Sequence, residues 1–221
     1  MNEFPPAYKP NETSLSFLYV DGGVIKKNPS PIGGTWAIRI IEEKTIHDAA
    51  GVVIPSDFGY NRHPSGCEAI TNNIAEMLAL VMGLRRLPRE WIGIICSDSE
   101  ITIGRATRFW KWKGIPLDLY NEFGYQRGRL VNWEKFRFIG LSGHPTEDDL
   151  KVGFRADTRR PVSRHNVWCD EMCKLMAQNY LNGGVTRLED VYDRTTEAGC
   201  DFGGNEKSLT VPEGSTNPES E

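Results

Sequence analysis

Four acidic residues stand where the sequence predicts the end of a strand or the start of a helix. Asp21 closes the apolar run SFLYVD, and Asp98 closes a second apolar run, WIGIICSD. Glu76 and Asp170 lie in the opening turns of two helical patterns, TNNIAEM and NVWCDE. A buried carboxylate is costly unless a cation pairs with it or it binds a metal ion. Taken one at a time, these acids are explained as a turn residue, a helix cap or favourable first-turn charges.

Taken together, the four acids predict a metal site. Carboxylates gathered at one end of a sheet repel one another unless cations lie between them. Ligand sets made only of oxygen favour Mg²⁺ or Mn²⁺ over zinc. Two such ions can activate a water molecule and stabilise the leaving oxygen in phosphodiester cleavage. Phosphodiester hydrolysis is therefore the chemistry that these residues predict, provided that the fold brings them together.

Three strand candidates open the chain and predict an antiparallel meander. They are SFLYVDG, TWAIRIIE and TIHDAAGVVIP, and turn residues separate them. The period then changes to that of a helix in TNNIAEMLALVMGLRRLP, whose apolar stripe consists of Ile74, Met77, Leu78, Val81 and Leu84. Capping candidates precede this helix, and Pro88 ends it.

The second half of the chain alternates strands and helices. WIGIICSD is almost wholly apolar, as in a strand that is covered on both faces. A helix over Ser99–Trp112, a second helix over Leu117–Leu130, the strand EKFRFIGLS and a closing helix, VWCDEMCKLMAQNYL, follow in turn. This order predicts a single α/β domain with one mixed sheet and helices on its faces. The first and fourth strands would lie side by side, so Asp21 and Asp98 would be neighbours.

Composition limits the class of protein. The chain has 221 residues, a net charge of −4 and five cysteines without a CxxC pair. It shows neither a signal-peptide pattern nor an apolar run near the roughly 20 residues of a membrane span, so we expect a soluble, cytoplasmic protein with reduced thiols. The acidic balance counts against avid nonspecific binding of nucleic acid. The segment Arg105–Lys113 (RATRFWKWK) is either a solvated helix face or a surface that binds a strand by charge and stacking.

Several phrases of the sequence resemble type 1 ribonuclease H. They are YVDGG with the following NPSPIGGTWA, TNNIAEMLALVMGL, CSDS, and GH with the later NVWCDE, and they span about Ser16–Leu181. The resemblance implies a ribonuclease H-like fold with a five-stranded mixed sheet, three antiparallel strands and then two parallel ones, flanked by helices. It divides the chain into a flexible leader (1–14), a catalytic domain (15–182), and an extension with a disordered acidic tail (183–221).

The resemblance also implies a function and a set of site residues. The expected activity is endonucleolytic cleavage of the RNA strand of RNA–DNA hybrids by a monomer, which leaves 5′-phosphate and 3′-hydroxyl ends. The residues implied to hold two Mg²⁺ or Mn²⁺ ions are Asp21, Glu76, Asp98 and Asp170. His144, in LSGHP, matches a loop histidine that assists proton transfer or product release. The implied substrate contacts are Gly22, Asn28, Thr71, Asn72, Asn73, Trp110 and Asn166.

One departure from the family pattern leaves the histidine open. Between His144 and Asp170 lie 25 residues, well over twice the usual span. Either Pro145–Arg164 is an insertion, which we expect to be irregular and mobile without substrate, or His165 is the functional histidine. Two other functions stay open as well: a ribonuclease H-like module that binds nucleic acid without cleaving it, and a DNA-directed nuclease of the same superfold.

A final hypothesis concerns the glycines that follow Asp21. Gly22 and Gly23 are interpreted as positions where the backbone must lie close to nucleic acid, so that a side chain on Gly22 would block the substrate. The alternative is that these glycines serve only the local structure.

Overall fold

The structure is a computed structural model that describes residues 16–43, 45–58, 67–184 and 192–197. The predicted leader and the end of the predicted tail, 198–221, lie outside these residues. None of the helices in the described ranges is long and apolar enough to cross a membrane.

Six strands form one mixed sheet in the order β5-β4-β1-β2-β3-β8. They are β1 (Ser16–Val24), β2 (Gly34–Glu42), β3 (Thr45–Val53), β4 (Gly93–Ser97), β5 (Arg137–Gly140) and β8 (Tyr192–Glu197). The first three strands form the predicted antiparallel meander, and β4 and β5 are parallel to β1. The predicted order of three antiparallel and then two parallel strands is therefore confirmed.

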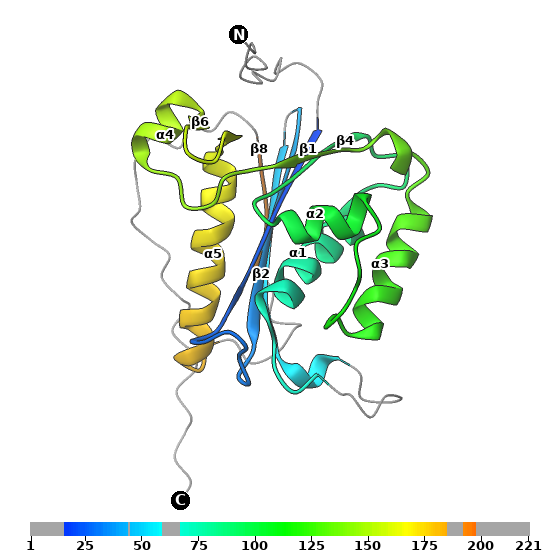
Figure 1. Cartoon of the computed structure of the whole chain (residues 1–221), viewed down its shortest axis with the longest axis vertical. Coiled ribbons are helices and arrows are strands. Elements are labelled where there is room, and N and C mark those ends of the chain that lie inside the picture. The colour runs from blue at the N-terminus through cyan, green and yellow to red at the C-terminus, as the bar shows by residue number, and fades with distance from the viewer. Residues whose placement is uncertain (1–15, 44, 59–66, 185–191, 198–221) are drawn as a thin grey trace, which may run out of the picture.

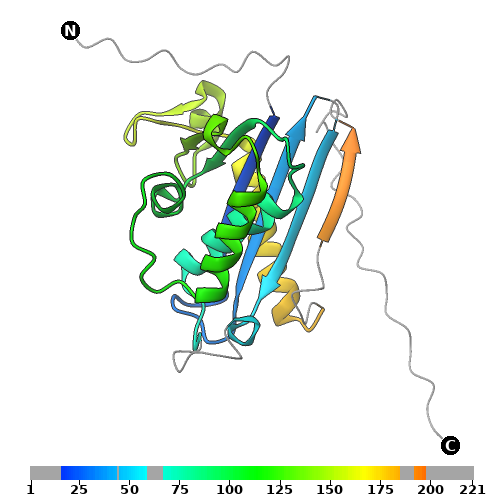
Figure 2. The same cartoon turned by 90° about the vertical axis from the view of Figure 1, so that its right-hand side faces the viewer.

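The prediction of five strands is one short. β8 lies in the segment 183–221, which was predicted to be an extension outside the domain, and it pairs antiparallel with β3 at the edge of the sheet (Figure 2). Its sequence, YDRTTE, has no alternating apolar residues, so no pattern indicated a strand. The sheet thus continues past the predicted domain boundary at residue 182.

Helices cover both faces of the sheet (Figure 1). One face carries α1 (Asn72–Arg86), α2 (Glu100–Thr107) and α3 (Leu117–Arg129), and the other carries α5 (Arg164–Leu181). Two short 3₁₀ helices, η1 (Pro55–Asp57) and η2 (Trp133–Lys135), lie in the connections. Successive side chains of a strand point to opposite faces of the sheet, so the sheet has a hydrophobic core on each face. Leu18 and Trp36 pack in the core that includes Met77 of α1, and Tyr19 packs in the core that includes Met172 of α5.

The predicted helix over Ser99–Trp112 is wrong at its end, because α2 stops at Thr107. The chain turns back there: the Trp110 amide donates to the carbonyl of Gly104, and the Trp110 ring fills the space beside that glycine. Arg105, which is buried, donates to the carbonyls of Lys111 and Lys113 at 3.3 Å each. The segment Arg105–Lys113 is therefore the end of a helix followed by a loop, and Arg105 stabilises that loop. It is not one solvated helix face.

The prediction that Pro145–Arg164 is irregular is also wrong. This insertion contains α4 (Glu147–Val152) and a hairpin of β6 (Phe154–Arg155) and β7 (Arg160–Pro161). Thr146 and Asp149 form a capping box at the start of α4, and Gly153 ends the helix in the left-handed conformation with φ 79°. These local signals order a segment that carries little apolar material.

Candidate active site

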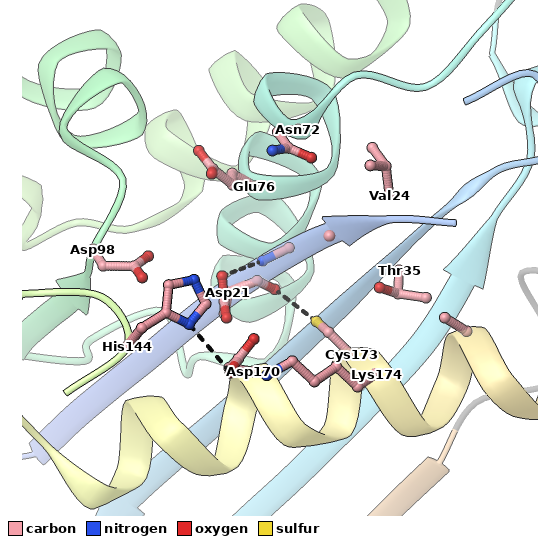
Figure 3. A pocket seen from close by; sticks show the side chains of 13 residues that line it. Asp21, Val24, Thr35, Asn72, Glu76, Asp98, His144, Asp170, Cys173 and Lys174 are labelled. Atoms are coloured by element: carbon pink, nitrogen blue, oxygen red, sulfur yellow. Dashed lines mark hydrogen bonds and ion pairs between the residues drawn. The ribbon is translucent and has the colours of Figure 1, made fainter. Parts of the chain in front are cut away.

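The four predicted acids line one pocket, although they come from four parts of the fold. β1 and β4 run parallel with Tyr19 opposite Cys96. Asp21, two residues further along β1, and Asp98, which directly follows the end of β4, therefore lie side by side. Glu76 comes from α1 and Asp170 from α5. The pocket has a volume of about 340 Å³, and its lining includes all four acids together with Asn72, His144, Cys173 and Lys174 (Figure 3).

Burial and mutual repulsion disturb three of these carboxyls. Burial, followed by the charge of Asp98, raises the pKa of Asp21 well above its ordinary value, and a hydrogen bond of 2.8 Å from the Gly22 amide only partly opposes this. Burial raises the pKa of Glu76 to about 7 and also raises the pKa of Asp98. All three shifts have the sign expected for carboxylates that share a pocket without a compensating cation.

The fourth acid has basic side chains as neighbours. The Lys174 ammonium donates to Asp170 Oδ2 at 2.6 Å, one helical turn along α5. His144 Nδ1 lies 3.8 Å from the same oxygen. The hydrogen bond to Asp170 raises the pKa of Lys174, so this cation stays charged at the rim of the pocket. Lys174 was not among the predicted site residues, although its i,i+4 spacing from Asp170 was a readable signal.

The donor set fits a hard divalent cation. It consists of carboxylate oxygens, which Mg²⁺ and Mn²⁺ prefer. The raised pKa of Asp21 reflects burial and the charge of Asp98, both of which a bound cation would offset. In the part of the chain that the structure describes, however, no group of three or more His, Cys, Asp or Glu side chains is already arranged to hold an ion. Glu76 instead accepts a long hydrogen bond of 3.5 Å from the Thr102 hydroxyl, and Asp170 is bound to Lys174.

Gly22 lines the pocket, but the structure gives it a different role from the predicted one. A Cβ at this position would collide with the backbone of α1 at Ala75 and Glu76. A Cβ on Gly23 would meet only the Thr35 hydroxyl at 3.3 Å and the Cys173 Cβ at 3.9 Å. The missing side chain at Gly22 therefore lets α1 pack on β1, which supports the alternative that this glycine serves the local structure. Its role toward nucleic acid stays a prediction.

The residues predicted to contact substrate divide into two groups. Asn72 is exposed and lines the pocket, and its backbone amide donates to the Asn28 side chain at 3.3 Å. Thr71 is the N-cap of α1 and accepts from the Ile74 amide. Of the seven predicted contacts, only Gly22 and Asn72 line the pocket as the described residues define it; the other five do not: Asn28, Thr71, Asn73, Trp110 and Asn166.

Asn166 nevertheless interacts with one of the site acids, Asp98. It is buried in the first turn of α5, and a hydrogen bond with it acts to lower the pKa of Asp98, against the effect of burial. Its Oδ1 has no hydrogen-bond partner among the described atoms. Asn166 therefore supports Asp98 and does not itself open into the pocket.

The two candidate histidines lie in different environments. His144 is exposed and lines the pocket beside Asp170. His165 packs against the ring of Tyr19, with ring centroids 5.1 Å apart, and its Nδ1 lies 3.5 Å from Arg39 Nη1. Burial, then the charge of Arg39, lowers the pKa of His165 to about 4. The geometry thus brings His144, and not His165, to the acids.

Comparison with known proteins finds structural relatives only. Neither a scan against protein-family models nor a search of curated proteins gives a match. Among solved structures, LC11-RNase H1 in complex with an RNA/DNA hybrid is similar with a TM-score of 0.50 and 16% identity, over 75% of this chain and 99% of that one. The N-terminal RNase H domain of rv2228c from Mycobacterium tuberculosis gives a TM-score of 0.51 and 14% identity, over 78% and 100%.

A third structure is LC9-RNase H1, described as a type 1 RNase H with the type 2 active-site motif. It gives a TM-score of 0.53 and 14% identity, over 82% of this chain and 78% of that one. The resemblance to type 1 ribonuclease H is thus confirmed at the level of the fold. At these identities the likeness concerns the fold alone.

Proposed function

We propose that this protein is an endonuclease that hydrolyses the RNA strand of RNA–DNA hybrids and leaves 5′-phosphate and 3′-hydroxyl ends. The observation that carries the proposal is the meeting of Asp21, Glu76, Asp98 and Asp170 in one pocket of a ribonuclease H fold. A protein with this fold, LC11-RNase H1, has been solved with an RNA/DNA hybrid, which supports the choice of substrate class.

The same four residues would hold two Mg²⁺ or Mn²⁺ ions. When bound, such ions supply an activated water and stabilise charge on the leaving oxygen. The chain's own contribution is to hold four carboxylates together at a cost in repulsion, so that the pocket attracts divalent cations strongly. Lys174 keeps a positive charge next to Asp170 and can neutralise part of the charge of an incoming phosphate.

His144 suits the movement of protons at the edge of this pocket. Its imidazole is exposed, lies beside Asp170, and has ring nitrogens that can accept and donate a proton. We assign it the transfer of a proton between the leaving 3′ oxygen and solvent, which would also ease departure of the product.

Selectivity for RNA would come from the start of α1. Asn72 is exposed in the pocket, and its amide group can exchange hydrogen bonds with a 2′-hydroxyl, which DNA lacks. Asn28 is tied to the same place through the Asn72 backbone. Two amides therefore lie where the minor groove of a hybrid could present its 2′-hydroxyls.

The proposal is tested with end-labelled RNA–DNA hybrid, double-stranded RNA and duplex DNA, each with Mg²⁺, Mn²⁺ or EDTA. We expect cleavage of the RNA strand of the hybrid alone, dependent on metal, with 5′-phosphate products. Cleavage of duplex DNA in preference would identify a DNA-directed nuclease instead.

A second candidate is a module that binds hybrid without cleaving it. It is favoured by one observation: the described acids are not already arranged as a metal site, and Asp170 accepts a hydrogen bond from Lys174. Hybrid binding that survives in EDTA, with no cleavage in either metal, would support this candidate.

A further inference from the structure

The insertion between His144 and Asp170 contacts the turn that carries His144. Arg155, at the end of β6, donates through Nη1 to the carbonyl of Gly143 at 2.9 Å and to that of His144 at 3.4 Å. Asp157 holds the same guanidinium from its other side, with Nε 2.9 Å from Oδ1. One arginine therefore ties both peptide units of the turn to the hairpin.

The β6-β7 hairpin makes two further contacts with the strand end before the turn. The Ser142 amide donates to the Pro161 carbonyl at 2.9 Å, and the Thr158 hydroxyl donates to Ser142 Oγ at 3.0 Å. On the side of α2, Arg160 pairs with Glu100 at 3.1 Å. The hairpin is thus fastened to the sheet and to the helix that follows Asp98.

The turn itself touches the acids. A Cβ on Gly143 would lie 2.7 Å from Asp98 Oδ2, so the backbone of the turn runs directly against that carboxylate. His144 has φ 49°, a left-handed conformation that a residue with a side chain adopts rarely and that surrounding contacts must maintain. The contacts from Arg155 fall on the carbonyls at either end of this strained residue.

From these contacts we infer that Arg155 is a positioning residue, which acts through the insertion to hold His144 over the active-site acids. His144 is then a fixed part of the site and not the tip of a mobile loop. The kinetic part of this inference rests on the proposed function, because it requires that His144 take part in hybrid cleavage. The structural part does not.

The structural part is tested by hydrogen exchange of the Ser142 amide in the full-length protein. Arg155→Gln removes the paired donors and should speed exchange of that amide about tenfold, which corresponds to about 1.4 kcal/mol of lost protection. Arg164→Gln is the matched control, because Arg164 belongs to the same region but, among the described residues, pairs only with the exposed Glu147. Unchanged exchange in Arg155→Gln would overturn the inference.

The kinetic part is tested by a double-mutant cycle on hybrid cleavage. Arg155→Gln should lower kcat about fivefold to tenfold with little change in KM, and Arg155→Lys, which keeps one donor, should lose less. In a His144→Ala background, Arg155→Gln should have no further effect. Multiplicative losses in the double variant would show that Arg155 does not act through His144 and would overturn its positioning role.

The two readouts separate failure of this inference from failure of the proposed function. If the wild-type protein does not cleave hybrid but Arg155→Gln still releases the Ser142 amide, the proposed function is wrong and the holding contact stands. If hybrid is cleaved and neither exchange nor kcat responds to Arg155→Gln, the proposed function stands and the positioning role is wrong.

Discussion

At the scale of single residues, the site is a set of carboxylates placed where they cost folding free energy. Strand ends and helix starts were enough to predict which acids meet, because an acid that closes an apolar strand needs a partner. Their neighbours were predicted less well. Lys174 lies one helical turn from Asp170, so its spacing was a readable signal. Arg155 contacts the turn that carries His144 from a distant hairpin, and no local pattern records that contact.

The first prediction at this scale concerns Asp21. In Asp21→Asn, hybrid cleavage should fall below a tenth of the wild-type rate, a loss of more than about 1.4 kcal/mol in transition-state stabilisation. Because the folded pKa of Asp21 is raised above its unfolded value, the carboxylate destabilises the folded state once pH rises above the ordinary aspartate range. In EDTA, the variant should therefore gain stability over wild type as pH rises above the ordinary aspartate range.

Thermal melting of both proteins at several pH values, with and without Mg²⁺, measures this effect. Mg²⁺ should stabilise wild type more than the variant. Asp148→Asn serves as control. Among the described residues, Asp148 pairs only with Lys151 on the surface of α4, so its substitution should alter neither cleavage nor the pH slope. A variant that retained wild-type cleavage would remove Asp21 from the site.

The second residue-scale prediction concerns His165. Its folded pKa of about 4 lies below the ordinary value of 6.5, so the folded state resists protonation and loses stability as pH falls between these values. At about 1.4 kcal/mol per pKa unit, the full loss is at most about 3.5 kcal/mol. His165→Phe keeps an aromatic ring against Tyr19 and should reduce this acid sensitivity, as measured by urea unfolding at pH 4, 5.5 and 7. If the free energy of unfolding changed equally with pH in the two proteins, this prediction about His165 would be contradicted.

At the scale of elements, prediction succeeded where apolar period and caps agree. α1 runs from its Thr71 cap to just before Pro88, and β4 is buried throughout, both as predicted. The insertion was misjudged because its order comes from a capping box and hydrogen bonds, while attention to apolar content alone predicts a loop. The end of α2 was missed because Trp110 folds back onto Gly104, a contact within the segment that periodicity does not reveal.

Packing of α1 on β1 gives the third prediction. Gly22→Ala places a methyl group against the α1 backbone and should lower the free energy of unfolding by about 2 kcal/mol or more, at the upper part of the usual range for overpacking. Gly23→Ala is the matched control and should cost less than about 1 kcal/mol, because its methyl group meets only side-chain atoms. Urea unfolding of both variants provides the measurement. A Gly22→Ala protein of wild-type stability would favour the substrate-approach hypothesis.

At the scale of the whole molecule, the sheet separates the site from its edge. The acids gather around β1 and β4, and two strands, β2 and β3, lie between β1 and the edge strand β8. β8 is held by its ladder with β3 and by Asp193, which pairs with His47 at 3.3 Å and with Arg86 at 3.5 Å. β8 thus covers the hydrogen-bonding edge of β3, a role that is not visible in the sequence YDRTTE itself.

The last prediction follows from this separation. A chain that ends at residue 184 lacks β8 and exposes the hydrogen-bonding edge of β3, which favours pairing between molecules. We expect a lower melting temperature and concentration-dependent self-association in size-exclusion chromatography. The kcat of the folded monomer at low concentration should stay within about twofold of the full chain, since no described residue of β8 lines the site. A chain that ends at residue 197 keeps β8 and should match the full protein in all three measurements. If the shorter chain stayed monomeric and equally stable, β8 would not be needed to cover the edge of β3. If it lost hybrid cleavage while remaining folded, the edge strand and the site would be coupled through β2 and β3, which their separation in the sheet does not predict.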